Sequence, residues 1–163
     1  MTLLYRIIAF ATSLVVVRVV VTGWSMHPTL ISGEYVLCNR FSYVWRPPRR
    51  GDVVIARIEP EATHTVIKRV VGTPGDIVCF EPGTVKVNDV QIVEPTYHAE
   101  ISKDKVSTWN LREDEWFLLG DNMAMMDMSI DSRLYGPVSR KSIKAKAILV
   151  CWPLSRWRIL DTE

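Results

Sequence analysis

Short β-branched runs, separated by Gly, Pro and Asp, make up most of this chain beyond residue 22. No segment there keeps the 3.6-residue apolar period of a long helix, and the sequence has no internal repeat. Pro47–Pro48, Pro74–Gly75 and Pro82–Gly83 fall between the runs, where hairpins would reverse. The sequence therefore predicts a mostly β fold, with a weak helical signal only at 139–144. The expected strands are 35–39, 52–58, 64–71, 77–80, 84–87, 116–119 and 145–152.

The length and charge of the chain limit the class of protein. A chain of 163 residues, 48% of them apolar, is enough for one compact domain and hardly enough for two. Residues 94–115 are polar and irregular, so we expect a long loop or small insertion there rather than a second domain. The net charge is +2 with the signs interspersed, so no basic stripe could hold a phosphate backbone. Nucleic acid is therefore not an expected partner.

The N-terminal segment 3–21, LLYRIIAFATSLVVVRVVV, is nearly all apolar or small and is broken only by Arg6 and Arg18. As a helix it would span roughly 28 Å, about one bilayer thickness, with an arginine near each end. We predict one N-terminal transmembrane helix, with residues 1–21 as membrane anchor and 22–163 as a β-rich domain. A cleavable signal peptide and a buried core helix are alternatives. The anchor is favoured because no good small-x-small cleavage site follows.

The three cysteines, Cys38, Cys79 and Cys151, lie far apart and form no CxxC pair. An odd number cannot all be bridged within one chain, so we expect buried thiols. One disulfide among them stays open, because the sequence does not choose a pair.

The first block with chemical character is GWSMHPTL, residues 23–30. Ser25 stands between a glycine, which lets the backbone approach a ligand closely, and Pro28, which restricts His27 to extended conformations. This context suits an exposed nucleophilic hydroxyl at a strand edge. A serine that merely caps a turn is the alternative.

The second block, TVIKRVVG at residues 65–72, places a lysine inside an apolar strand pattern. Strand alternation puts Val66, Lys68 and Val70 on one face and Arg69 on the other, so Lys68 could be buried while Arg69 is solvated. Burial among apolar groups can lower the pKa of a lysine by several units and make it a general base. A solvated lysine at a sheet edge is the alternative.

The third block consists of GDN at residues 120–122 and SIDSRLYGPV at residues 129–138. The hydroxyl of Ser129 could orient the amine of Lys68. Asp131 and Arg133 are two residues apart and could pair near the site. An ordinary surface turn with an ion pair of little energetic consequence is the alternative.

In this order, SMHPTL, RRGDVVIARIEP, IKRVVGTPGD, GDN and SIDSRLYGPV resemble the type I signal peptidases, a family that includes the mitochondrial inner-membrane peptidases. The resemblance covers most of the chain and implies a signal-peptidase-like β-sheet catalytic domain. It also implies Ser25 as nucleophile, Lys68 as general base and Ser129 as the hydroxyl that positions the lysine. Asp131 and Arg133 match a structural ion pair.

The function implied by this resemblance is a membrane-bound serine endopeptidase that removes N-terminal signal peptides from translocated preproteins. Its Ser–Lys dyad would act through an acyl-enzyme and need no cofactor or metal. The implied partners are preprotein signal peptides and membrane lipid. We expect a single-pass protein of the bacterial plasma membrane with its catalytic domain on the extracytoplasmic side; the mitochondrial inner membrane is the alternative.

Two other functions are kept for comparison. His27, His64 and His98 could serve a Ser-His-Asp triad or zinc, but the sequence has no GxSxG elbow, no HExxH and no histidine pair at ligand spacing. The loop MAMMDM between Asn122 and Ser129 is longer than is usual in the family. A catalytically weak or inactive membrane-tethered subunit that binds precursor peptides is therefore the second functional hypothesis.

Overall fold

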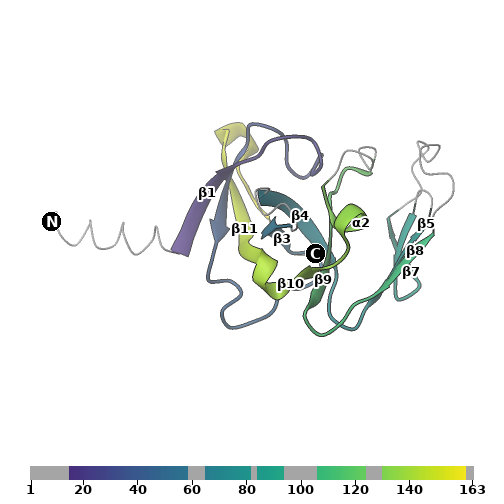
Figure 1. Cartoon of the computed structure of the whole chain (residues 1–163). Coiled ribbons are helices and arrows are strands. Elements are labelled where there is room, and N and C mark those ends of the chain that lie inside the picture. Colours follow the sequence, from purple (N-terminus) through teal and green to yellow (C-terminus); the bar gives the residue numbers. More distant parts are fainter. Residues whose placement is uncertain (1–14, 59–64, 82–83, 94–105, 124–129, 161–163) are drawn as a thin grey trace.

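The computed structural model describes residues 15–58, 65–81, 84–93, 106–123 and 130–160, and these form two antiparallel sheets (Figure 1). The larger sheet has eight strands in the order β1-β2-β11-β3-β4-β9-β10, with β12 paired to β11. Its strands are β1 Val16–Val20, β2 Tyr35–Asn39, β3 Val53–Arg57, β4 Thr65–Gly72, β9 Glu115–Leu119, β10 Val138–Ser139, β11 Ile143–Trp152 and β12 Arg158–Ile159. The expected mostly β fold is confirmed.

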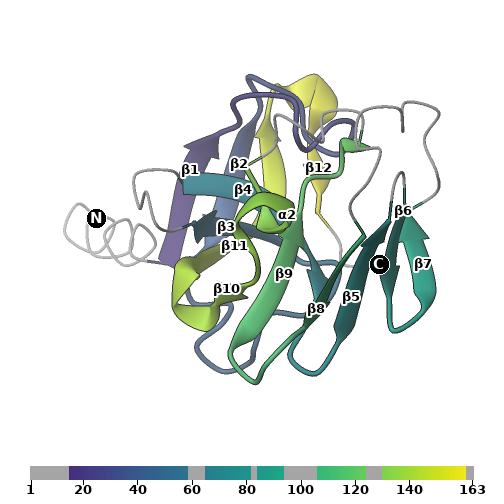
Figure 2. The ribbon, with the colours of Figure 1, turned by 45° about the vertical axis from the view of Figure 1, so that its right-hand side comes forward.

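The smaller sheet has four strands in the order β7-β6-β5-β8 and stands beside β9 (Figure 2). Its strands are β5 Ile77–Glu81, β6 Thr84–Val87, β7 Val90–Val93 and β8 Ser107–Asn110. β4 leads into it through Gly72, which packs against Leu111, Val78 and Phe117. The position is closely packed on both sides, because a Cβ at Gly72 would lie 2.7 Å from side-chain atoms of Leu111 and Val78.

The expected anchor at residues 1–21 needs a correction at its end. Val16–Val20 is not helical but pairs as strand β1 with β2, from Val16 opposite Asn39 to Val20 opposite Tyr35. The run VVRVV is β-branched at every position but one, and such side chains favour a pleated strand over a helix. Within the described residues, no helix is long and apolar enough to cross a membrane. Residues 1–14 lie outside the described part of the chain.

Two further expectations differ from the structure. The expected loop at 94–115 contains strand β8, which pairs with β5 across Phe80 and Ser107, and β9 already begins at Glu115. Residues 94–105 lie outside the described residues. The helical signal at 139–144 corresponds to one 3-10 turn, η3 Arg140–Ser142, after which β11 begins at Ile143.

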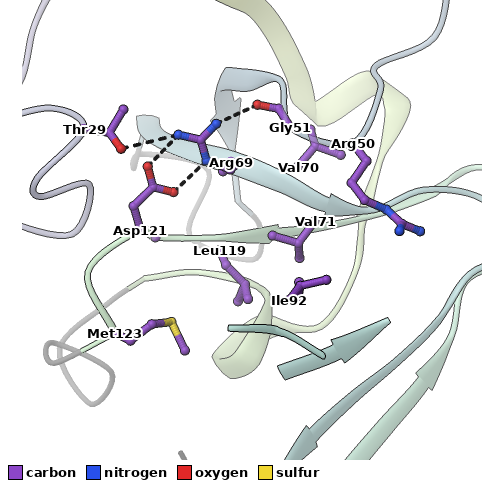
Figure 3. Close-up of a pocket in the computed structure, with 11 residues that line it drawn as sticks. Thr29, Arg50, Gly51, Arg69, Val70, Val71, Ile92, Leu119, Asp121 and Met123 are labelled. Atoms are coloured by element: carbon purple, nitrogen blue, oxygen red, sulfur yellow. Dashed lines mark hydrogen bonds and ion pairs between the residues drawn. The ribbon is translucent and has the colours of Figure 1, made fainter. Parts of the chain in front are cut away.

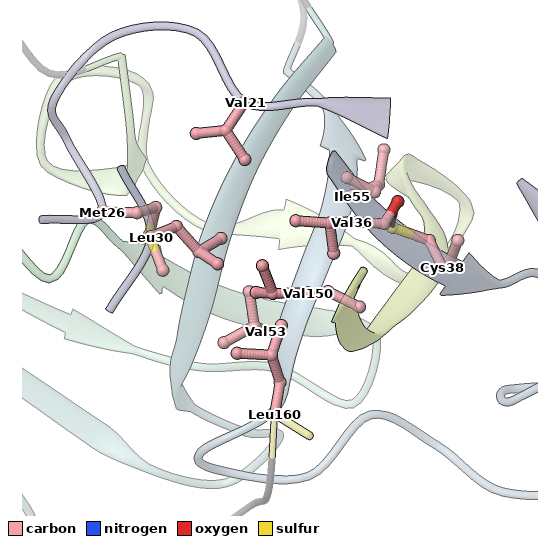
Figure 4. Close-up of a cluster of buried hydrophobic side chains, with 11 residues drawn as sticks. Val21, Met26, Leu30, Val36, Cys38, Val53, Ile55, Val150 and Leu160 are labelled. Carbon is pink, nitrogen blue, oxygen red and sulfur yellow. Dashed lines mark hydrogen bonds between the residues drawn. The ribbon is translucent and has the colours of Figure 1, made fainter. Parts of the chain in front are cut away.

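Three apolar clusters form the core of the described part of the chain. One joins β1, β2, β3 and β11 to the loop after β1 through Met26 and Leu30, which are both fully buried (Figure 4). A second lies around Val54, Val70 and Leu118. The third packs the small sheet against β4 and β9. All three cysteines are free thiols; Cys38 is buried, and Cys79 and Cys151 are partly buried.

Candidate active site

The loop of residues 22–34 carries Ser25, and we call it the Ser25 loop. Its two ends are tied together, because Val21 N–H donates to the Glu34 carbonyl at 2.8 Å and Gly33 N–H donates to the Val21 carbonyl at 2.9 Å. Met26 and Leu30 hold the middle of the loop in the core. Ser25 is left partly buried between exposed Trp24 and buried Met26. The serine therefore sits on a loop that is fixed at both ends and in its middle.

Glu34, the last residue of the Ser25 loop, ties the loop to the C-terminal segment. Its buried carboxylate accepts hydrogen bonds from Ile31 N–H at 2.9 Å and from the side chains of Arg156 and Arg158 at 2.5 and 2.8 Å. Arg158 also donates to the Thr29 carbonyl. Burial alone would raise the pKa of Glu34, but these hydrogen bonds lower it to about 2.

Lys68 lies in the middle of β4 and only 2% of it is exposed. It is opposite Val54 of β3, and its alternate neighbours Val66 and Val70 pack in the cluster around Val54 and Leu118. Burial lowers the pKa of Lys68 to about 8; the Asp131 carboxylate opposes this shift and the Arg133 guanidinium adds to it. A lysine with this pKa is neutral in about a tenth of the molecules at pH 7 and in about half of them at pH 8.

Asp131 and Arg133 form an ion pair at 2.6 Å at the start of the short helix α2 Ser132–Tyr135. Asp131 is the N-cap of this helix: its fully buried carboxylate accepts from both the backbone N–H and the side chain of Arg133. The Ser132 hydroxyl accepts from Leu118 N–H of β9 at 2.9 Å. These bonds attach the third sequence block to the strand beside β4.

Arg69, the residue after Lys68, was expected to be solvated, but its side chain is mostly buried and paired. It points to the other face of β4 and forms a two-pronged ion pair with Asp121, at 2.8 and 2.7 Å (Figure 3). It also donates to the Gly51 carbonyl at 2.8 Å and to the Thr29 hydroxyl at 3.4 Å. Arg69 thus links the strand of Lys68 to the Ser25 loop and to the end of β9.

Asn122 completes this link. Its backbone N–H donates to the Ser25 carbonyl at 2.9 Å, and its side-chain amide donates to the Trp24 carbonyl at 3.0 Å. The GDN block contains Asp121 and Asn122, but the sequence alone assigns no role to either residue. The one sequence signal for a role is that both residues directly follow a predicted strand. Their partners, Arg69 and Ser25, are distant in the sequence and come close only through the order of the strands in the sheet.

A groove of about 510 Å³ lies beside the Arg69–Asp121 pair (Figure 3). It is lined by Thr29 and Gly51 at one side and by Val71, Leu119 and Met123 at the other. A second groove of about 600 Å³ shares Thr29, Gly51 and Arg69 with it and runs between the Ser25 loop and the C-terminal residues Arg158, Ile159 and Leu160.

The remaining predicted site residues are placed as follows. Ser129, His64 and His98 lie outside the described residues. His27 is exposed on the Ser25 loop, 6.0 Å from the Trp24 ring between centroids. In the described part of the chain, no carboxylate pairs with His27 and no group of His, Cys, Asp and Glu could hold a metal ion. The structure thus places Asp131 and Arg133 near enough to Lys68 to act on its charge, attaches their helix to β9, and ties Ser25 to Asn122 just beyond the end of β9.

Comparison with known proteins gives a consistent result. The profile of the family described as "Signal peptidase, peptidase S26" matches residues 1–152. "Signal peptidase I" of Leptolyngbya laminosa is 32% identical over 81% of this chain and 66% of its own length. "Signal peptidase I V" of Bacillus subtilis is 33% identical over 76% of this chain and 78% of its own. "Mitochondrial inner membrane protease subunit 1" of Schizosaccharomyces pombe is 35% identical over 83% and 73%. The chain spans just under two thirds of the Leptolyngbya protein.

Proposed function

Because this chain belongs to the signal peptidase family, peptidase S26, we propose that it is a serine endopeptidase that removes N-terminal signal peptides from preproteins. Ser25 acts as the nucleophile and Lys68 as the general base. The observation that carries the proposal is the burial of Lys68, which lowers its pKa to about 8, on a strand tied to the Ser25 loop through Arg69.

The reaction begins with neutral Lys68, whose Nζ lone pair takes the proton of the Ser25 hydroxyl. The Ser25 oxygen attacks the scissile carbonyl carbon, and the peptide C–N bond breaks as Lys68 returns the proton to the leaving amine. The resulting acyl-enzyme ester is hydrolysed by a water molecule that Lys68 deprotonates. Free Ser25 and the new carboxyl terminus are the products. Each step moves one proton through the same amine, so no cofactor is required.

Three residues support this chemistry. We assign Ser129 to orient the Lys68 amine through its hydroxyl. Asp131 and Arg133 hold the segment after Ser129 against β9, because their ion pair caps α2 and Asp131 also accepts from Gly120 N–H at 3.4 Å. The two charges act on Lys68 with opposite sign, so burial sets the direction of its pKa shift.

The substrate and location follow from the family. We assign an extended signal peptide with small residues one and three positions before the cut as substrate, docked as an added strand. The enzyme is membrane-bound through the apolar segment ahead of β1, with the catalytic domain on the extracytoplasmic side. We favour a bacterial plasma membrane; the relatives from mitochondria make the mitochondrial inner membrane the alternative.

The test is cleavage of a purified preprotein in detergent by the wild type, Ser25→Ala and Lys68→Ala. The wild type is expected to cut once, after a small-x-small site located by mass spectrometry, and both variants to be inactive. His27→Gln is the matched control and should keep its activity. A wild type that binds the preprotein without cutting it would contradict the peptidase and support the binding subunit instead.

A further inference from the structure

Residues 40–50, RFSYVWRPPRR, form most of the connection between β2 and β3 and expose large apolar side chains. Trp45 is 91% exposed, Val44 57% and Phe41 47%. Single exposed apolar residues are ordinary on protein surfaces, but three of them within five residues form a local patch. We call residues 40–50 the β2–β3 loop.

The β2–β3 loop that exposes these side chains is itself held in place by hydrogen bonds to the rest of the domain. Tyr43 is buried and donates from its hydroxyl to Asp52 at 2.9 Å, while its carbonyl accepts from Arg140 at 2.7 Å. Pro48 is buried, and its carbonyl accepts from the Trp116 indole N–H at 3.1 Å. With two inward side chains fixed, the backbone holds Phe41, Val44 and Trp45 outward.

The charge of the β2–β3 loop has one sign. Arg40, Arg46, Arg49 and Arg50 are all exposed, residues 40–50 contain no Asp or Glu, and Asp52, which follows before β3, is buried and bonds to Tyr43 and Lys146. Arg50 pairs with Asp76 at 2.9 Å, whereas among the described residues the other three have no ion-pair partner. Aromatic side chains interleaved with arginines are typical of a surface that meets anionic headgroups at a bilayer interface.

The loop also lies where the apolar N-terminal sequence joins the sheet. Arg40 N–H donates to the Val15 carbonyl at 2.9 Å, so the loop begins beside the first described residue. Figure 1 shows it leaving β2 at the end where β1 starts. The sequence ahead of Val15 includes IIAFA and is apolar except for Arg6 and its few hydroxyls. A bilayer that receives this segment is within reach of the loop.

We propose that the β2–β3 loop is a second membrane contact, in which Phe41, Val44 and Trp45 enter the interfacial layer of an anionic bilayer. Arg40, Arg46 and Arg49 bind the headgroup phosphates around them. With the N-terminal segment as the first contact, two attachment points fix the orientation of the domain, and hence of the Ser25 loop, to the membrane. This rests on the proposed function only in placing the protein at a membrane.

The experiment uses the full chain reconstituted into vesicles of phosphatidylcholine, with or without about 30% phosphatidylglycerol, whose acyl chains carry bromine near the interface. The emission of Trp45 is obtained as the difference between wild type and Trp45→Phe. We expect it to be quenched at least twofold in anionic vesicles. The double variant Arg40→Gln/Arg46→Gln should lose most of this quenching, since each arginine near such a surface changes binding about threefold to fivefold. Arg112→Gln, an exposed arginine outside the loop, is the matched control and should keep it.

Three results would overturn the proposal. In the first, bromine does not quench the emission of Trp45. In the second, the double arginine variant is quenched as strongly as the wild type. In the third, the full chain does not float with the vesicles. In the first case, shielding of Trp45 only when other membrane proteins are present would point to a protein partner instead. Peptide hydrolysis in detergent separates this from the proposed function: Trp45→Phe should cleave at the wild-type rate, while a wild type without hydrolysis overturns the peptidase alone.

Discussion

Lys68 is the residue at which the fold pays an electrostatic cost for chemistry. In the unfolded chain its ammonium titrates near 10.4, and burial against Val54 and Val70 lowers the pKa to about 8. Between these two values the unfolded chain binds more protons than the folded one. The free energy of unfolding therefore rises with pH across this window, and the cost is fully present below pH 8.

Replacing Lys68 by Met should stabilise the protein while abolishing activity. At pH 7 we expect the free energy of unfolding to rise on the order of 3 kcal/mol, because each unit of pKa shift corresponds to about 1.4 kcal/mol. The difference from wild type should shrink between pH 8 and 10. Urea unfolding in detergent at several pH values measures it. Lys144→Met, an exposed lysine of β11, is the control and should show no such pH dependence.

Glu34 has the opposite role, because its charge stabilises the fold. Its folded pKa of about 2 lies below the usual 4.5, so this stabilisation is fully present above pH 4.5 and is lost as pH falls towards 2. Glu34→Gln leaves Arg156 and Arg158 without their carboxylate and should cost roughly 2–4 kcal/mol at pH 7. Thermal unfolding checks this. Glu81→Gln, which removes the half-exposed pair with Lys86, should change little; an equal loss in both variants would contradict the assignment.

At the scale of secondary-structure elements, Arg69 is the main link in the site. It joins β4 to the residue after β9 through Asp121 and to the Ser25 loop through Thr29. Arg69→Lys keeps the charge but cannot make both bonds to Asp121 and the bond to Gly51 in one plane. We expect kcat to fall about tenfold to a hundredfold with little change in KM, since the loop carrying the nucleophile shifts. Peptide hydrolysis measures both constants.

The matched control for this prediction is Arg50→Lys. Arg50 lines the same groove and pairs with Asp76, and within the described residues it forms no ion pair with Asp121 and no hydrogen bond to the Ser25 loop. Its variant should keep kcat within about twofold. If both variants lose activity to the same degree, the effect comes from the groove rather than from the link.

The elements also show where sequence reasoning succeeds. β2 and β6 have the bounds that the sequence predicts, because both are short runs that end at polar or turn residues. β1 differs from the predicted helix, since a nearly continuous apolar run, broken here only by Arg18, has no period that separates helix from strand. β8 was missed because its sequence STWN is polar and becomes a strand only through pairing with β5.

The candidate site divides in the same way. Burial of Lys68 followed from strand alternation, which depends on local sequence alone. The partner of Arg69 did not, because Asp121 reaches it only through the order of β4 and β9 in the sheet. The local sequence thus predicts which face of a strand a side chain occupies, but it does not predict which residue of another strand that side chain contacts.

The whole molecule depends on how its two sheets join, and Gly72 lies at a closely packed point between them. Gly72→Ala would place a Cβ 2.7 Å from side-chain atoms of Leu111 and Val78, so we expect a loss of about 1–3 kcal/mol in the free energy of unfolding. Urea unfolding measures it. Leu111→Ala removes one of the two contacts, so the double variant should lose less than the sum of the single losses; strict additivity would contradict the packing account.

The most direct test of the central claim, that a buried neutral lysine activates Ser25, is the pH dependence of kcat/KM for a signal-peptide substrate. Below pH 8 we expect kcat/KM to rise about tenfold per pH unit and then to level off, because only the neutral form of Lys68 takes the Ser25 proton. His27→Gln should show the same profile. An inflection near pH 6.5 that disappears in His27→Gln would instead assign the base to a histidine and contradict the lysine mechanism.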